Sequence, residues 1–200
     1  MEENIKKSKF FEIQEKIYRR VRFKGIKNIE KVLCVDSAYK KDYAICVGVL
    51  FDIKNDEVLN VYFRKERVKF PYIPGLLFLR EGKIILRVLK DIKENYDLII
   101  VDGHGLSHPR KAGLATYVGV MSKKPTIGIA KKYLFGDIVD NIIYVDNMKV
   151  GIKVGKYYFS IGSNIDFESL VEFLKSINFS YPRGMVIADK LSKYLAKRIL

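Results

Sequence analysis

The sequence predicts an α/β fold: a mixed sheet, with an antiparallel meander and parallel strands, flanked by helices. Three patterns predict it: β-rich runs between polar turns in the first third, short apolar runs alternating with helical patterns in the middle, and helical spacing near both ends. The chain has 200 residues, of which 48% are hydrophobic, enough for a sizeable core. We therefore expect one domain over residues 1–200, without repeats or flexible linkers.

A helix is expected first, over residues 5–23, because apolar residues such as Phe10 and Ile17 recur at helical spacing among charged ones. Gly25 then offers a stop. Three β-rich runs follow with short polar segments between them, which predicts an antiparallel meander. These runs are residues 32–35, 43–51 and 58–63.

Helical and strand patterns alternate through the middle of the chain. Helical spacing over residues 76–92 leads into the apolar run 98–101, which is typical of a strand buried on both faces. A short helix over 114–121 and a second buried strand over 125–129 follow, and this alternation implies parallel pairing. The remaining elements expected are strands at 142–145, 149–154 and 156–161 and helices at 166–176 and 184–199.

The charge balance points to a polyanionic partner. Lys+Arg 37 against Asp+Glu 23 gives a formal net charge of +14, so nucleic acid is the first partner to test, although basic surfaces can also serve solubility alone. Cys34 and Cys46 lie in strand-like runs without metal-ligand spacing and are expected to be reduced core residues. No apolar stretch reaches the roughly 20 residues of a membrane span. We expect a cytoplasmic monomer with no membrane partner.

Three acidic residues lie where the chain is expected to change direction. Asp36 ends the first predicted strand, Glu81 opens the helix after the proline-rich turn, and Asp102 ends a central strand. Carboxylates gathered together repel one another unless neutralised, and oxygen ligands of this kind select Mg²⁺ or Mn²⁺. The commoner role of acids at element ends is a cap or a solvated residue, so spacing alone leaves both readings open. The other acidic residues near turns are expected to lie in the turns themselves or on solvated faces: Asp42, Asp52, Asp56, Glu57 and Asp97.

Four segments occur in an order that identifies a family. They are Val35-Asp36-Ser37, residues 71–82, residues 102–115 and residues 125–131. Together they closely resemble endonuclease V, the family that nicks nucleic acid near deaminated adenine, that is, inosine. The resemblance runs from Val32 to Gly136 and is weak in the last third. It implies a ribonuclease H-like fold and hydrolysis, dependent on Mg²⁺ with Mn²⁺ as a substitute, of the second phosphodiester 3′ to the lesion, leaving 3′-hydroxyl and 5′-phosphate ends.

The resemblance also implies roles for particular residues. Asp36, Glu81 and Asp102 match the metal ligands, and Lys131 matches the active-site lysine, whose cation can stabilise charge on the transferring phosphate. The family has a fourth acidic or imidazole position on its C-terminal helix, and Asp189 is the candidate here. A surface ion pair with the lysine one turn later would explain Asp189 just as well.

Residues 71–74 form a stiff, apolar, aromatic turn that resembles the family's wedge. Inserted at a base step, Tyr72 would fill the space left by an extruded nucleotide. The alternative is a buried turn that packs Tyr72 into the core. In the implied pocket, main-chain groups would read the C6 carbonyl and protonated N1 of hypoxanthine, although the same glycines could simply make turns. The wedge and pocket residues are Pro71, Tyr72, Ile73, Pro74, Gly75, Leu77, Gly103, His108, Arg110, Gly113, Leu114 and Leu134.

His104 departs from the family pattern, in which an amide side chain commonly lies between the two glycines, so its contact with substrate is left open. His104 and His108 are four residues apart, but the glycine between them and the expected loop argue against a zinc pair on a helical face. Basic residues flank the motif segments and could contact phosphates. They are Arg110, Lys111, Lys123, Lys124 and Lys132.

The leading hypothesis is a metal-dependent endonuclease that acts on deoxyinosine in DNA, in DNA repair. One alternative is an endoribonuclease for inosine in single-stranded RNA. An alternative of another class is a nucleic-acid-binding module without catalysis. Retention of Asp36, Glu81, Asp102 and Lys131 argues against the last, because acids facing phosphates would weaken pure binding.

Overall fold

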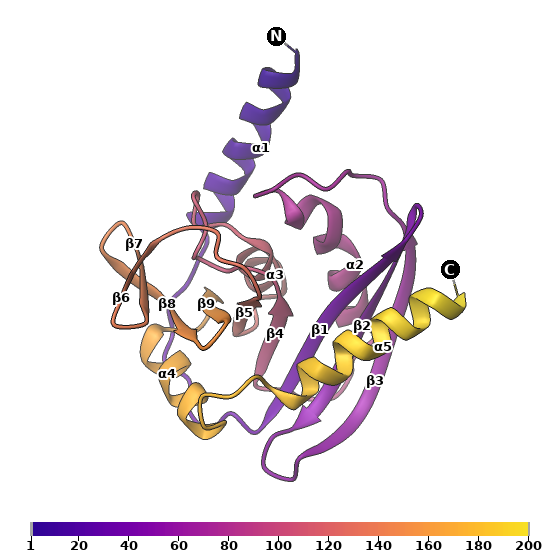
Figure 1. Ribbon diagram of the computed structural model, residues 1–200, viewed down its shortest axis with the longest axis vertical. Coiled ribbons are helices and arrows are strands. Elements are labelled where there is room, and N and C mark those ends of the chain that lie inside the picture. The colour runs from indigo at the N-terminus through magenta and orange to yellow at the C-terminus, as the bar shows by residue number, and fades with distance from the viewer. Residues whose placement is uncertain (1, 200) are drawn as a thin grey trace.

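A computed structural model describes residues 2–199, with side chains from residue 9 onward. Its elements form one nine-stranded sheet with helices on both faces (Figure 1). In chain order they are α1 (Glu2–Tyr18), β1 (Lys31–Lys40), β2 (Tyr43–Asp52), β3 (Glu57–Arg67), α2 (Leu77–Asp91), β4 (Leu98–Asp102), α3 (Leu114–Ser122), β5 (Thr126–Ala130), β6 (Asp137–Val139), β7 (Ile142–Val145), β8 (Met148–Val154), β9 (Tyr157–Ser163), α4 (Phe167–Ser176) and α5 (Arg183–Ile199).

The strand order across the sheet is β3-β2-β1-β4-β5-β9-β8-β7-β6. Strands β1 to β3 form an antiparallel meander, as the polar turns predicted. The central strands β1, β4 and β5 are parallel, and β9 returns antiparallel to β5. The predicted mixed sheet is therefore confirmed. Parallel neighbours bring the carboxyl ends of β4 and β5 to the same edge.

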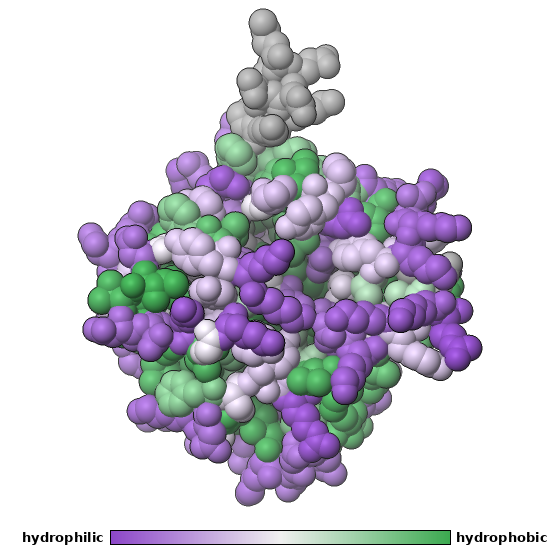
Figure 2. Space-filling view, in the orientation of Figure 1, coloured by the Kyte–Doolittle hydropathy of each residue, from purple (hydrophilic) through white to green (hydrophobic). Residues whose placement is uncertain are grey.

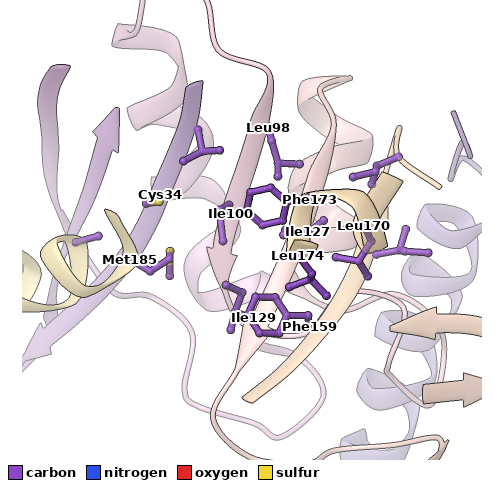
Figure 3. Close-up of a cluster of buried hydrophobic side chains, with 14 of the residues drawn as sticks. Cys34, Leu98, Ile100, Ile127, Ile129, Phe159, Leu170, Phe173, Leu174 and Met185 are labelled. Carbon is purple, nitrogen blue, oxygen red and sulfur yellow. The ribbon is translucent and has the colours of Figure 1, made fainter. Parts of the chain in front are cut away.

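Alternating side chains of the central strands divide the core into two layers. Cys34, Ile100 and Ile129 pack with α4 and α5 on one face of the sheet (Figure 3). Leu33 and Ile99 face the other way and pack with α2 and α3. Strands β1 and β4 are covered on both faces, which explains why their sequences contain continuous apolar runs. Both cysteines are free and buried, as expected.

The first helix is shorter than the predicted span of residues 5–23. It ends at Tyr18, and the following segment runs beside β9 and α4. There the Arg22 amide donates to Ser163 Oγ at 3.2 Å, and the Ile26 amide donates to Ser169 Oγ at 2.9 Å. These partners replace the bonds that another helical turn would have made.

The expected positions of two acidic residues within their elements were also wrong. Strand β1 continues to Lys40, so Asp36 lies inside the strand, opposite Val47 of β2, rather than at its end. Helix α2 begins at Leu77, which places Glu81 in its second turn. No helix between residues 2 and 199 is long and apolar enough to cross a membrane.

Candidate active site

Three carboxylates converge where the sheet meets α5. Asp36 lies on β1, Asp102 ends β4 and Asp189 lies on α5, and one oxygen of each lies within 4.8 Å of the others. Asp36 follows Cys34 by two residues, and Asp102 follows Ile100 by two, so strand alternation directs both toward α5. We call these three residues the carboxylate cluster.

Lys131 follows β5 and lies between two members of the cluster. Its Nζ is 3.2 Å from Asp102 Oδ2 and 2.9 Å from Asp189 Oδ1. Asp189 Oδ2 also pairs with Lys193 at 2.6 Å, so Asp189 makes the expected ion pair and also lies in the carboxylate cluster. Burial opposes ionisation of Asp189, but hydrogen bonds from the two lysines outweigh it and lower the pKa of this carboxyl.

Asp36 is the most enclosed member of the cluster. It is buried, and Ser192 of α5 donates a hydrogen bond to its Oδ2. Burial raises the pKa of Asp36 to about 7, and the nearby charge of Asp102 adds to the shift. A cation bound beside Asp36 would stabilise its ionised form and offset the cost of burying that charge.

Glu81 approaches from the other face of the sheet, on α2, and lies outside the 4.8 Å group. Burial raises its pKa to about 8, with smaller contributions from Asp36 and Asp102, so Glu81 lies within electrostatic reach of both. The ligand role assigned to Glu81 stays a prediction. The cluster itself offers only carboxylate oxygens, the donor set that suits Mg²⁺ or Mn²⁺.

Tyr181 is a neighbour of the cluster that sequence reasoning missed. Its hydroxyl is buried and has no hydrogen-bond partner among the described residues. Burial raises the pKa of this phenol, and the charge of Asp102 raises it further. The ring stacks on Tyr157 with centroids 4.3 Å apart. No motif or periodicity marks this residue, which lies in the irregular segment just before α5.

A cavity of about 210 Å³ adjoins the cluster. The two lie side by side because Gly103 follows Asp102 and Lys132 follows Lys131. A volume this small suits one ring system rather than a drug-sized ligand. The lining residues are Tyr72, Pro74, Gly75, Leu77, Phe78, Gly103, His104, His108, Ala112, Gly113, Leu114, Lys132, Tyr133 and Leu134.

Most residues assigned to the pocket line this cavity, but Pro71, Ile73 and Arg110 do not. Four lining residues were not predicted for the pocket: Phe78, Ala112, Lys132, which was expected only as a phosphate contact, and Tyr133. Lys132 and Tyr133 immediately precede Leu134, which was assigned, so their position in the same loop was the available signal. Tyr72 is 65% exposed, so the alternative that packs it into the core is wrong.

The wall of the cavity is tied together by Gln14, another residue that sequence reasoning missed. Its Nε2 donates to Gly75 O at 2.9 Å and to Ala112 O at 2.8 Å. Arg110 Nε donates to Gln14 Oε1 at 2.5 Å, which directs this guanidinium into the wall. Gly75 has a φ of +78°, a conformation that favours glycine, and its carbonyl also contacts His108 Nε2 at 3.0 Å.

His108 is a neutral imidazole whose two ring nitrogens are both hydrogen-bonded. The Arg110 amide donates to its Nδ1 at 3.1 Å, which leaves the proton on Nε2 for the Gly75 carbonyl. Burial lowers the pKa of His108 to about 4, and the Arg110 cation adds to the effect. Since both ring nitrogens are engaged, the geometry argues against a zinc pair with His104. Burial also lowers the pKa of His104, whose Nδ1 has no partner among the described residues.

Two glycines of the loop after β4 are required by close packing. A Cβ on Gly105 would lie 2.0 Å from the carbonyl oxygen of Ile161, and one on Gly113 would lie 2.2 Å from that of His104. Either contact would displace backbone. The loop that carries the pocket is thus fixed against β9 and against itself, which keeps His104 next to Asp102.

Comparison with known proteins finds similar sequences over most of the chain. The family model described as Endonuclease V matches residues 12–190. A protein named Endonuclease V from Sulfolobus acidocaldarius is 46% identical over 181 residues, 87% of each chain. Its counterpart from Sulfurisphaera tokodaii is 43% identical over 184 residues, covering 90% of this chain and 89% of its own.

Solved structures match the fold. Endonuclease V of Bacillus subtilis has a TM-score of 0.84 at 25% identity, over 96% of this chain and 93% of its own. Endonuclease V of Ciona intestinalis, in complex with a 24mer DNA containing an inosine followed by a ribo-adenosine, has a TM-score of 0.85 at 20% identity, over 98% of this chain and 99% of its own. The expected ribonuclease H-like mixed sheet is confirmed.

Proposed function

Because the chain belongs to the endonuclease V family, whose members are nucleases, we propose that it is a Mg²⁺-dependent endonuclease for inosine in DNA. It would hydrolyse the second phosphodiester 3′ to the hypoxanthine nucleotide, in repair of deaminated adenine. Mn²⁺ would substitute for Mg²⁺. The observation that carries this proposal is the convergence of Asp36, Asp102 and Asp189 beside a cavity with an exposed tyrosine on its wall.

In this proposal Tyr72 enters the nucleic acid and the cavity receives the extruded base. Unstacking a base costs a few kcal/mol, which contact with the aromatic ring partly offsets. The glycine-rich wall leaves main-chain groups of Gly103 and Gly113 within reach of the base edge. Because cavity and cluster adjoin, a base held in the cavity positions the phosphodiester of its own strand near the cluster.

The cluster residues would hold the divalent ion, and Glu81 would support them from the other face of the sheet. When bound, the ion polarises the phosphodiester and lowers the pKa of the attacking water. Lys131 orients the phosphate and stabilises its developing charge. Water adds to phosphorus as the P–O3′ bond breaks, so the products carry a 3′-hydroxyl and a 5′-phosphate.

The decisive experiment uses matched DNA and RNA oligonucleotides with a single inosine, incubated with Mg²⁺ and mapped for the cut position. Asp36→Ala and Asp102→Ala should each abolish nicking while leaving binding in Ca²⁺ largely intact. The exposed Asp137→Ala serves as the control and should cleave normally. Normal cleavage by either cluster variant, or a cut elsewhere, would refute the proposed site.

A second candidate is an endoribonuclease for inosine in single-stranded RNA. The ribo-adenosine that follows inosine in the Ciona intestinalis complex favours considering it. Faster cleavage of the RNA oligonucleotide in the same experiment would select this alternative. A binding module without catalysis is disfavoured, since three carboxylates within 4.8 Å of one another would repel a phosphate in the absence of a cation.

A further inference from the structure

A cavity of about 670 Å³ lies away from the carboxylate cluster and is lined mainly by cations. Its walls are Arg19, Arg20, Val21, Arg22, Val120, Lys123 and Asn164, with no acidic residue among them. We propose that this cavity, together with the groove beside it, binds the phosphate backbone of a nucleic-acid segment outside the active site. This inference rests on the proposed function for the identity of the polyanion.

The cavity is a fixed feature because three segments of the chain are hydrogen-bonded around it. The Asn164 amide donates to Arg22 O at 2.6 Å, and Asn164 Nδ2 donates to Gly119 O at 2.9 Å. The Lys123 amide also bonds to Gly119 O, at 3.0 Å, in the cap that ends α3. The end of β9 therefore holds the chain after α1 against the end of α3, and the cations on these segments are held in proximity.

Helix ends explain only part of this charge. Arg19 and Arg20 follow the end of α1, and Lys123 follows the end of α3, where cations are favoured. Each helix C-terminus contributes about half a negative charge, so the two together offset only about one of the four cations. The pair between Arg19 and Glu15 spans 4.0 Å between exposed side chains and adds little. A surplus of roughly three positive charges faces the cavity.

A second cavity, a groove of about 730 Å³, continues this surface between the ends of α2 and α3. Its cations include Lys83, Lys90, Lys93 and Lys124, and residues 121–124 lie between the two cavities. Glu94, the acid in its lining, already accepts hydrogen bonds from neighbouring side chains.

The groove also contains an aromatic ring. Tyr96 is half-buried against the core layer of α2 and α3, and Lys124 Nζ lies over its ring, 5.2 Å from the centroid; both residues line the groove. A ring beside lysines is the arrangement that proteins use to stack bases of single strands while neutralising their phosphates. The groove therefore favours a nucleic-acid strand over a compact anion.

This basic surface lies on the side of the sheet opposite the carboxylate cluster. Val120 of the cavity belongs to the core layer of α2 and α3, whereas the cluster lies on the α5 side. Lys124 precedes β5 and Lys131 follows it, and the five residues of this strand span roughly 16 Å. The occupant is consequently a segment separate from the one being cut, such as flanking strand that wraps around the molecule.

The test measures how binding of a long, inosine-free single strand depends on salt. The triple variant Arg19→Gln, Arg20→Gln, Arg22→Gln should reduce the slope of log K against log salt by about 2, since each lost phosphate contact accounts for about 0.7. The control variant Lys54→Gln, Lys156→Gln, Lys175→Gln removes the same charge from exposed positions outside both cavities and should leave the slope unchanged. Equal slopes for the two variants would overturn the proposal.

Two further readouts separate this proposal from the proposed function. Single-turnover cleavage of an inosine oligonucleotide just long enough to cover the active site should be the same in the triple variant and the unmodified protein. A chain that never cuts at inosine would refute the proposed function, while the salt slope on inosine-free strand would still decide this one. Tyr96→Ala should weaken binding of single strand but not of inorganic polyphosphate; equal loss for both would rule out base stacking.

Discussion

At the scale of single residues, Asp36 and Glu81 make stability depend on pH. Burial raises the pKa of Asp36 from 3.8 to about 7 and that of Glu81 from 4.5 to about 8. The folded chain therefore holds more protons than the unfolded chain between about pH 4 and pH 8. Without a divalent ion, the contribution of these two groups to the free energy of unfolding is greatest below this window and is lost as the pH rises through it.

Urea unfolding in EDTA at pH 5 and at pH 8 measures this loss, which should be on the order of 3 kcal/mol for each of the two groups. Asp36→Asn and Glu81→Gln should each flatten the dependence, because an amide cannot ionise. Asp137→Asn, at an exposed position, should leave it unchanged. A stability that rises between pH 5 and pH 8 would contradict the proton assignment.

Tyr181→Phe tests the unpartnered hydroxyl beside the cluster. Removing a buried hydroxyl that has no partner relieves a desolvation penalty, so the free energy of unfolding should stay unchanged or rise by about 1 kcal/mol. The cleavage rate should fall roughly tenfold, because the neutral phenol can donate to a bound phosphate or its water. Single-turnover kinetics measure the cleavage rate of Tyr181→Phe. The control is Tyr157→Phe, which keeps the ring stack. A fall in stability together with activity would indicate a purely structural role.

At the scale of elements, Gln14 links α1 to the two segments that form the cavity wall. Gln14→Ala removes three hydrogen bonds of a buried side chain, two of them part-buried, and should lower the free energy of unfolding by roughly 2–4 kcal/mol. Looser support for the turn that carries Tyr72 should also reduce discrimination between inosine and adenine.

Denaturant unfolding and paired cleavage assays measure both effects of Gln14→Ala. The exposed Lys16→Ala on the same helix should stay within about 0.5 kcal/mol of the unmodified protein. Unchanged stability of the Gln14 variant would show that the wall holds without this link.

Elements with strong local patterns were predictable from sequence, and those set by distant contacts were not. The buried strands β4 and β5 and the helix α2 follow from apolar periodicity, and Asp102 is located by the end of its strand. Strand β1 runs past Asp36 because β2 pairs with residues as far as Lys40, a contact that the local sequence does not encode. Strand β6 has only three residues, all exposed, which is too few for a recognisable alternation.

The same limit applies to the candidate site. The expected strand ends and the family motifs predicted that Asp36, Asp102 and Lys131 belong to one site. In the structure these residues lie together with Asp189. Gln14 acts through main-chain carbonyls far along the chain, so no spacing could reveal it.

At the scale of the whole molecule, a divalent ion should stabilise the fold. Mg²⁺ at one hundred times its dissociation constant should add about 2.7 kcal/mol, which raises Tm by roughly 5–10 °C for a chain of this length. EDTA should reverse the shift. In thermal melts, the rise in Tm with Mg²⁺ should be absent in Asp102→Asn and retained in Asp137→Asn. Equal shifts in the two variants would place the ion elsewhere.

Hydrophilic side chains lie on both faces of the molecule. They cover much of the face that α5 crosses (Figure 2). The cations of the basic cavities lie on the opposite face and contribute to the net charge of +14. Association with polyanions is therefore expected to slow as salt rises.

Helix α5, which lies across β1 and β2, supplies Asp189 to the cluster and Ser192 to Asp36 (Figure 1). While the polypeptide is being made, β1 and β4 emerge from the ribosome well before α5. The carboxylate cluster is therefore incomplete until α5 has been synthesised and has docked on the sheet.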